Sequence, residues 1–328
     1  MNSPVRIGTR ESQLAVWQAT LVQNLLKENG FPSELIYIKS EGDVNTVTPL
    51  YEIGVQGIFT KTLDAALLNK RIDIAVHSMK DVPTQLATGI KQAAVLKRAS
   101  YKDIFVFKDE LYKVSDELGI VNGQWLMGSK KSTFTTHPSP FTIATSSIRR
   151  KAQWLHRYPN HSIENLRGNV NTRLKKVYEN EWNGAIFAAA GLERINIRPQ
   201  NSIDLDWMLP APAQGAIMIV CREDDEVSFD ACKVFNDTYT ALCTKIERDF
   251  LRTLLGGCST PISALAEVKN NVIFFKGNIC SPDGKQKFEI EKEFLLNDAD
   301  KSGNIAAKEL LENIEAKEII YTIRNEKN

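Results

Sequence analysis

The stretch Ile72-Asp73-Ile74-Ala75-Val76-His77-Ser78-Met79-Lys80-Asp81 indicates a buried strand that runs into a polar turn. A helical pattern over residues 59–68 precedes it, and a strand, a helix and a second strand are predicted over residues 5–38. Strands that alternate with helices favour a parallel, doubly wound α/β sheet. Ligands of such sheets bind at the carboxyl ends of the strands, so we expect a binding site beside residues 77–83.

The same alternation resumes after residue 100 and later stops, which predicts two α/β lobes and a different C-terminal domain. The second series has strands at residues 103–107, 141–144, 162–166 and 184–191, with a polar, irregular segment at 109–140. The tail has a long helix at 237–254, strands at 262–268, 272–279 and 288–294, and a closing helix at about 304–315. Turn residues between the three strands favour an antiparallel sheet, so the tail is expected to be a small α+β domain.

Charge and cysteine usage exclude several classes of protein. The 328 residues include 41 Lys+Arg and 40 Asp+Glu, so the overall charge favours neither a nucleic acid nor a membrane partner. The N-terminus has no apolar signal core and no stretch approaches the length of a membrane span, which makes a cytoplasmic location the expectation. Five cysteines without Cys-x-x-Cys spacing, and four histidines without metal-ligand spacing, argue against a disulfide framework and a metal site.

Three predicted strand-to-helix turns each carry arginine and hydroxyl groups. They are Arg10 with Ser12, the run Thr145-Ser146-Ser147-Ile148-Arg149-Arg150, and Arg167 with Arg173. Backbone N–H groups at a helix start bind anions, and guanidinium groups bind carboxylates and phosphates. Together the turns suggest a cleft for a polycarboxylate or a phosphate ligand. Taken singly, each turn is also compatible with an ordinary N-cap and solvated arginines.

One cysteine lies in the glycine-rich loop Leu254-Leu255-Gly256-Gly257-Cys258-Ser259-Thr260-Pro261. Gly256 is expected to cap the preceding helix, and Pro261 prevents the helix from resuming. A short, rigid connection suits a covalent attachment point at Cys258, and it also suits a structural turn. The pair Lys80-Asp81 leaves a similar choice between proton transfer or cation stabilisation and a surface ion pair. His77 fits either a packed core residue or a catalyst.

Seven motifs carry a resemblance to a known family. They are Arg6-Ile7-Gly8-Thr9-Arg10-Glu11-Ser12, Ala75-Val76-His77-Ser78-Met79-Lys80-Asp81-Val82-Pro83, Thr145-Ser146-Ser147-Ile148-Arg149-Arg150, Leu166-Arg167-Gly168-Asn169-Val170-Asn171-Thr172-Arg173-Leu174, Ala190-Gly191-Leu192-Glu193-Arg194, Gln214-Gly215-Ala216 and Gly256-Gly257-Cys258. In this order and spacing they resemble the hydroxymethylbilane synthases, also called porphobilinogen deaminases. The resemblance covers nearly the whole chain.

The resemblance implies a fold and a reaction. The fold would be two similar lobes of the periplasmic-binding-protein type with the active cleft between them, plus the C-terminal α+β domain. The implied boundaries are 1–99 with 216–237, then 100–215, and then 238–328. The enzyme would be a monomeric transferase of haem biosynthesis that joins porphobilinogen units, with loss of ammonia, into a linear tetrapyrrole. The growing polypyrrole would be anchored on a dipyrromethane cofactor held by a thioether to Cys258, and no metal would be needed.

The resemblance also implies roles for individual residues. Asp81 would be catalytic, stabilising the cationic pyrrole that forms when ammonia leaves. The residues expected to hold the cofactor are Lys80, Thr145, Ser146, Ser147, Arg149, Arg150, Gly168, Arg173 and Gln214. Those expected to bind substrate are Arg10, Ser12, Arg149, Arg167, Arg173 and Arg194. Bidentate binding of carboxylates by arginine fits a chain of pyrroles that each carry an acetate and a propionate.

The sequence departs from the family at three places, and two other functions compete. Gln56 stands where many members have a lysine, and Glu52 stands where some relatives have one. The segment 109–140 is longer than the same connection in compact members. A two-lobed binding protein for an anion would need neither the third domain nor the cysteine loop. A thiol hydrolase using Cys258 and His77 would have a free, reactive thiol.

Overall fold

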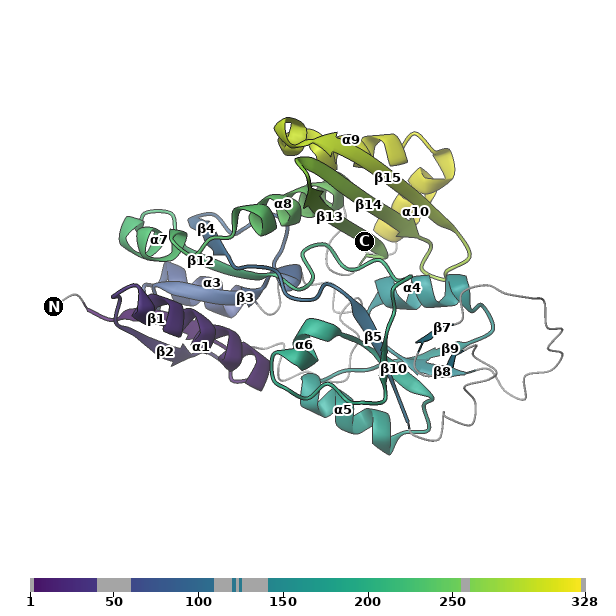
Figure 1. The fold of residues 1–328 in the computed structure, drawn as a ribbon, viewed down its shortest axis with the longest axis horizontal. Helices are drawn as coiled ribbons and strands as arrows, with labels where there is room; N and C mark the ends of the chain where they lie inside the picture. Colours follow the sequence, from purple (N-terminus) through teal and green to yellow (C-terminus); the bar gives the residue numbers. More distant parts are fainter. Residues whose placement is uncertain are drawn as a thin grey trace.

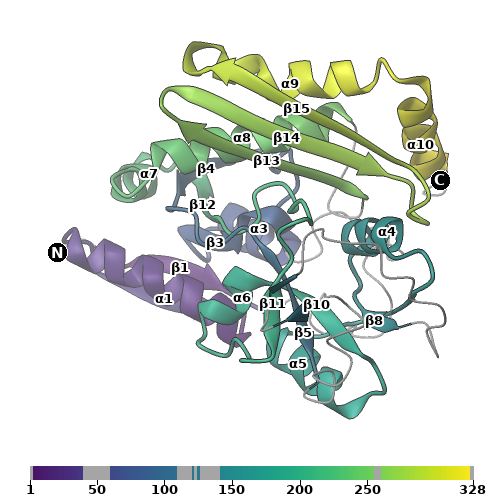
Figure 2. The same cartoon turned by 45° about the vertical axis from the view of Figure 1, so that its right-hand side comes forward.

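The computed structural model describes residues 3–39, 60–108, 120–121, 124–125, 141–254 and 260–325. Two five-stranded α/β sheets form two lobes, and a three-stranded antiparallel sheet with its own helices lies across both lobes (Figure 1). Figure 2, turned by 45°, shows the third sheet lying above the first lobe at one end and above α4 of the second lobe at the other. The predicted architecture of two similar α/β lobes and a small α+β domain with a three-stranded antiparallel sheet is confirmed.

The first lobe is built on a sheet that contains a strand from much later in the sequence. Its order is β2 (Ser33–Tyr37), β1 (Val5–Thr9), β3 (Ile74–Ser78), β12 (Ile217–Arg222) and β4 (Ile90–Val95). Its helices are α1 (Gln13–Glu28), α3 (Lys61–Leu68) and α7 (Glu226–Lys233). Apolar side chains of the strands are almost fully buried between these helices, which fixes the register of the sheet.

The second lobe repeats the arrangement. Its sheet has the order β11 (Ser202–Asp204), β5 (Asp103–Phe107), β10 (Gly184–Ala188), β8 (Thr142–Ala144) and β9 (Ser162–Glu164). Its helices are α4 (Ile148–Arg157), α5 (Val170–Glu179) and α6 (Ala189–Glu193). A short ladder between β6 (Ile120–Val121) and β7 (Gln124–Trp125) is the described part of the segment 109–140.

Both sheets are mixed, whereas the sequence pattern predicted parallel sheets. In the first lobe β12 runs antiparallel to β3 and β4, and in the second lobe β5 runs antiparallel to β10 and β11. These are the strands that enter each lobe directly from the other one: β5 follows the outgoing crossing at residues 96–102, and β12 follows the returning crossing at residues 205–216. Because both crossings lie at the carboxyl ends of the parallel strands, a strand that starts there must run in the opposite direction. The polar turns of the parallel strands therefore lie beside the two crossings.

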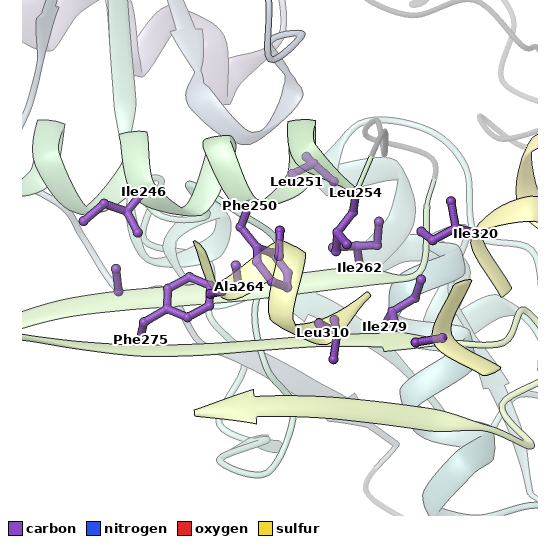
Figure 3. Packing of buried hydrophobic residues seen from close by; sticks show 14 of the residues in the cluster. Ile246, Phe250, Leu251, Leu254, Ile262, Ala264, Phe275, Ile279, Leu310 and Ile320 are labelled. Atoms are coloured by element: carbon purple, nitrogen blue, oxygen red, sulfur yellow. The ribbon is translucent and has the colours of Figure 1, made fainter. Parts of the chain in front are cut away.

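The third domain packs a long helix against its sheet. The strands are β13 (Ile262–Lys269), β14 (Val272–Cys280) and β15 (Lys287–Leu295), close to the predicted ranges. The helix α8 (Thr238–Thr253) also matches its prediction, with Asp237 as its N-cap. Figure 3 shows Phe250 of α8 against Phe275 of β14, with ring centroids 5.1 Å apart. These two rings anchor a core that excludes water between the helix and the sheet.

Two predicted element boundaries are wrong. Residues 189–191 begin the helix α6 instead of extending the preceding strand. The closing helix predicted at about 304–315 is two helices, α9 (Ala299–Leu310) and α10 (Ile314–Asn325). The break between them has a local cause, because the side chain of Asn313 accepts a hydrogen bond from the N–H of Ala316 and starts a new helix.

Candidate active site

Three helices begin directly after strands, and each begins at a side-chain cap. Ser12 caps α1, Ser147 caps α4 and Asn169 caps α5, in each case by accepting a hydrogen bond from a backbone N–H in the first turn. The predicted strand-to-helix turns are therefore present. Each cap leaves further N–H groups at the positive end of a helix, which favours an anion nearby.

The turn after β3 carries Lys80 and Asp81 in a short 3-10 helix, Met79–Asp81. Lys80 is half-buried and Asp81 is exposed. A side chain of the third domain holds this turn, because Arg248 of α8 donates to the carbonyl oxygens of Val82 at 2.9 Å and Pro83 at 2.6 Å. Sequence reasoning missed Arg248, since its contact exists only once α8 packs on the first lobe. The turn is thus fixed to the helix that leads into the Cys258 loop.

Arg149 and Arg150 share a partner that the sequence did not predict. Asp103, the first residue of β5, is fully buried. Its Oδ1 accepts hydrogen bonds from Nε and Nη2 of Arg150, at 3.0 and 2.7 Å, and from Nε2 of Gln214, at 3.0 Å. Its Oδ2 lies 2.8 Å from Nη2 of Arg149. Burial by itself raises the pKa of Asp103, but the charges of the two arginines and the Gln214 amide hold that pKa below its usual value.

The charges of this site are close enough to influence one another. Burial lowers the pKa of Lys80 to about 8; Arg150 and Arg149 also lower it, whereas Asp81 and Asp103 raise it. The lobes therefore bring the turn after β3 near the start of α4. A lysine with this pKa is still mostly cationic at neutral pH.

The turn before α5 joins the same cluster. Arg173 is half-buried, and burial together with Arg150, Arg167 and Arg10 lowers its pKa to about 10, with Asp81 opposing this effect. Arg10, Arg167 and Asp81 thus lie close enough to Arg173 to influence its charge. Burial also lowers the pKa of Arg167. Guanidinium groups whose pKa falls on burial sit where an anion would be stabilising.

The other predicted residues of the second lobe shape its two turns. The Ser146 hydroxyl accepts from the N–H of Leu166 at 3.0 Å, which ties the start of α4 to the segment that carries Arg167. Thr145 is buried and its Oγ1 accepts from the N–H of Ser147 at 3.2 Å. Gly168 has a φ of +115°, and its carbonyl oxygen accepts from Nε of Arg173 at 2.7 Å. These groups therefore hold the arginines in place.

Arg194 lies apart from the charge cluster, between the lobes. Its Nη2 donates to the carbonyl oxygen of Gly215 at 2.7 Å, and its guanidinium lies 5.8 Å from the ring centre of Trp17 on α1. Burial lowers the pKa of Arg194 to about 10. A second link between the lobes joins the Asn171 amide to Oε1 of Gln13 at 2.8 Å. Arg194 thus contacts both the first lobe and the returning crossing.

The remaining residues that the sequence singled out are His77 and three that lie outside the described ranges. His77 is buried, and burial together with the charge of Arg10 lowers its pKa to about 4, so the imidazole is neutral at physiological pH. Cys258, Gln56 and Glu52 lie outside the described residues. Within the described ranges there is no group of three His, Cys, Asp or Glu residues suited to a metal ion. No helix in those ranges is both long and apolar enough to cross a membrane.

Comparisons with known proteins identify the family. The family model "Porphobilinogen deaminase, dipyromethane cofactor binding domain" matches residues 5–230, and "Porphobilinogen deaminase, C-terminal domain" matches residues 241–312. The porphobilinogen deaminase of Chlorobium phaeobacteroides is 38% identical over 333 residues, covering 99% of each chain. That of Campylobacter hominis is 36% identical over 312 residues, covering 94% of each chain. Among solved structures, a VFT2 domain of Bordetella pertussis BvgS is 13% identical with a TM-score of 0.38, covering 70% of this chain and 84% of that one. The chain therefore belongs to the porphobilinogen deaminase family.

Proposed function

We propose that Asp81 is the catalytic carboxylate of this hydroxymethylbilane synthase and that Cys258 carries its dipyrromethane cofactor. The enzyme is a transferase of tetrapyrrole biosynthesis that joins four porphobilinogen molecules into linear hydroxymethylbilane. The observation that carries the proposal is that the exposed Asp81 interacts electrostatically with Lys80 and Arg173, while Arg150 and Arg10 are close enough to Arg173 to lower its pKa. A cluster of cations beside one carboxylate suits a substrate that is a polyanion and becomes a cation at its reacting carbon.

The donor set fits the dipyrromethane group, which carries two acetates and two propionates. Lys80 and Arg173 have pKa values lowered by burial, and additional negative charge beside them would stabilise their charged forms. Arg149 and Arg150 would contribute their remaining N–H groups, and Ser147 would add its hydroxyl. When bound, the cofactor supplies the terminal pyrrole carbon to which the first substrate is joined.

The chain's own residues account for the remaining requirements of the reaction. Arg10, Arg167 and Arg173 bind the acetate and propionate groups of the substrate and of the elongating chain, with Ser12 as a further donor and Arg194 at the edge between the lobes. Asp81 accepts a hydrogen bond from a pyrrole N–H and stabilises the positive charge that develops when ammonia leaves. The same carboxylate takes up and returns protons during the step. His77 is neutral and buried, and its role is to pack against the core beside the turn after β3.

Intact-protein mass spectrometry tests the attachment at Cys258. Protein made with an adequate supply of porphobilinogen is expected to carry the added mass of two substrate-derived pyrroles, and Cys258→Ser is expected to lack it. Cys243→Ser, a change at a buried cysteine of α8, is the matched control and should keep the adduct. A folded, unmodified wild-type protein with a freely reactive Cys258 would instead support the thiol hydrolase. An unmodified protein that binds a polyanion without turnover would support the binding protein.

Asp81→Asn tests the catalytic carboxylate, because it removes the charge and keeps the shape. We expect it to retain the cofactor mass and to lose at least about 100-fold in kcat, the range typical of general acid–base groups. Asp283→Asn, in an exposed turn of the third domain, is the control. Near-normal porphobilinogen consumption by Asp81→Asn would refute the assignment.

We also propose that the chain works as a cytoplasmic monomer without a nucleic-acid partner, with domains at 1–99 and 216–237, 100–215 and 238–328. The nearly balanced charge supports the absence of nucleic acid. The positions of β12 in the first sheet and of β5 in the second support the domain boundaries. Light scattering of the purified protein checks the monomer, and a mass twice that of the chain would contradict it.

A further inference from the structure

One buried carboxylate connects three parts of the second lobe. Asp103 begins β5, at the point where the chain enters this lobe from the first one. It contacts Arg149 and Arg150 at the start of α4, and Gln214 in the segment that returns to the first lobe. Gln214 is also fully buried, and its Nε2 donates to the carbonyl oxygen of Tyr101 at 2.7 Å. Both crossings and the arginine pair therefore meet at Asp103.

These contacts fix the orientation of both guanidinium groups. Arg150 uses Nε and Nη2 for Asp103 and donates from Nη1 to the carbonyl oxygen of Ile186 at 2.9 Å. Arg149 pairs through Nη2 with Asp103 and donates from Nη1 to the carbonyl oxygen of Leu209 at 2.8 Å. A planar guanidinium held on two edges cannot rotate, so the direction of its other N–H groups is set. Of these contacts, only the one to a backbone carbonyl oxygen would remain for each arginine if Asp103 were removed.

The carboxylate also balances charge at the site. Arg149, Arg150 and Lys80 influence one another, and Asp103 is the buried negative group among them, with Asp81 exposed beside Lys80. Removing the charge of Asp103 would leave three neighbouring cations, and the one that can lose its proton near neutral pH is Lys80. The expected response is a neutral Lys80, which cannot bind a carboxylate as an ion pair.

We propose that Asp103 is a positioning residue for the anion-binding side chains: it orients Arg149 and Arg150 and keeps Lys80 cationic beside them. The proposal rests on the role of these cations in holding the cofactor and the substrate. The proposed role has two parts. The orientation of Arg149 and Arg150 depends on where the carboxylate lies, whereas the charge of Lys80 depends only on a negative charge nearby.

Two substitutions at Asp103 separate these effects. Asp103→Asn keeps the size and removes the charge, whereas Asp103→Glu keeps the charge and moves the carboxylate by one methylene. Asp73→Asn is the matched control, since Asp73 also binds two arginines, Arg6 at 2.7 Å and Arg222 at 3.6 Å, at the opposite end of the first sheet. The double variant Lys80→Arg/Asp103→Asn replaces the titrating group by one that stays charged.

Three quantities are measured. Intact-protein mass gives the extent of cofactor loading, and steady-state kinetics across pH give KM and kcat for porphobilinogen. Peptide mass mapping of cofactor-loaded protein gives the pH dependence of Lys80 acetylation. For Asp103→Asn we expect the midpoint of Lys80 acetylation to fall by at least roughly half a pH unit from its wild-type position, with a KM about tenfold higher at pH 8. Asp103→Glu should keep that midpoint and still show reduced loading or a higher KM. Asp73→Asn should change none of the three.

The outcomes separate failure of this proposal from failure of the proposed function. A wild-type protein that neither carries the cofactor nor consumes porphobilinogen overturns the function itself. A wild-type protein that does both, with Asp103→Asn matching Asp73→Asn in loading, KM and Lys80 acetylation, overturns the role of Asp103 alone. If Asp103→Asn does not fold, Asp103→Glu decides: wild-type loading and KM in that variant would show that the position of the carboxylate does not matter.

Discussion

At the scale of single residues, the sequence identifies side chains that act at turns and misses those that act through burial. Lys80 and Asp81 are recognisable because they follow a predicted strand, and Arg149 and Arg150 because they follow a run of hydroxyls. Asp103 precedes the apolar run of β5 and has the pattern of an ordinary strand start. Its partners lie 46 to 111 residues away along the chain, a separation that local patterns do not reveal.

The first prediction concerns Lys80 and pH. With a pKa of about 8, this lysine is cationic below pH 8 and becomes neutral above it. The carboxylates of the bound cofactor raise this pKa further, so substrate binding should weaken, and KM should rise, as the pH increases above 8. Arginine stays protonated over this range, so Lys80→Arg should flatten the alkaline rise of KM even if it lowers kcat. Steady-state kinetics between pH 6.5 and 9.5 provide the check, and an unchanged alkaline rise in Lys80→Arg would exclude Lys80 as its source.

At the scale of elements, periodicity predicts the helices and strands with long apolar patterns, and it fails where an element depends on its neighbours. The ranges of α8 and β14 agree with prediction to within a residue or two, because their apolar faces are continuous. The edge strand β11 and the helix α7 were not predicted. The antiparallel direction of β12 was also not predicted, because it follows from where the chain crosses between the lobes and not from the residues of the strand.

The second prediction concerns the returning crossing, where the chain passes very close to the outgoing one. Gly215 has a φ of +88°, and an added Cβ would lie 2.7 Å from the carbonyl oxygens of Ala99 and Ser100. Gly30 has a similar φ of +82°, but no atom lies within 4 Å of its added Cβ. Alanine at either position meets the strain of a left-handed backbone, about 1 kcal/mol, and only at Gly215 does it also meet backbone atoms.

Gly215→Ala should therefore lower the free energy of unfolding by at least about 2 kcal/mol, and Gly30→Ala by about 1 kcal/mol. Urea unfolding of both variants, followed by fluorescence, measures the difference. Equal losses in the two variants would show that the close approach of the crossings contributes nothing beyond the left-handed conformation.

At the scale of the whole molecule, a second buried carboxylate joins the lobes to the third domain. Glu247 of α8 is fully buried and accepts hydrogen bonds from Arg98 of the outgoing crossing, from the N–H of Ala213 in the returning one at 2.6 Å, and from the N–H of Ala266 in β13 at 2.9 Å. Gln153 of α4 adds a direct link to the third domain through its bond to Ser263 at 3.0 Å. The third domain is therefore attached to both crossings, so a change in the relative position of the lobes would alter the contacts of Glu247.

The third prediction tests this attachment. Glu247→Gln leaves the Arg98 charge buried with one neutral oxygen in place of a carboxylate, and breaking such a pair from one side costs about 3–5 kcal/mol of stability. Replacing both partners, Arg98→Met with Glu247→Gln, removes the uncompensated charge while one amide oxygen still accepts from a backbone N–H. The double variant should therefore be more stable than Glu247→Gln alone, although less stable than wild type, because one backbone donor loses its acceptor. Thermal unfolding of the three proteins decides the matter. A loss below about 1 kcal/mol in Glu247→Gln would mean that the domains are held mainly by their apolar contacts and not by this carboxylate.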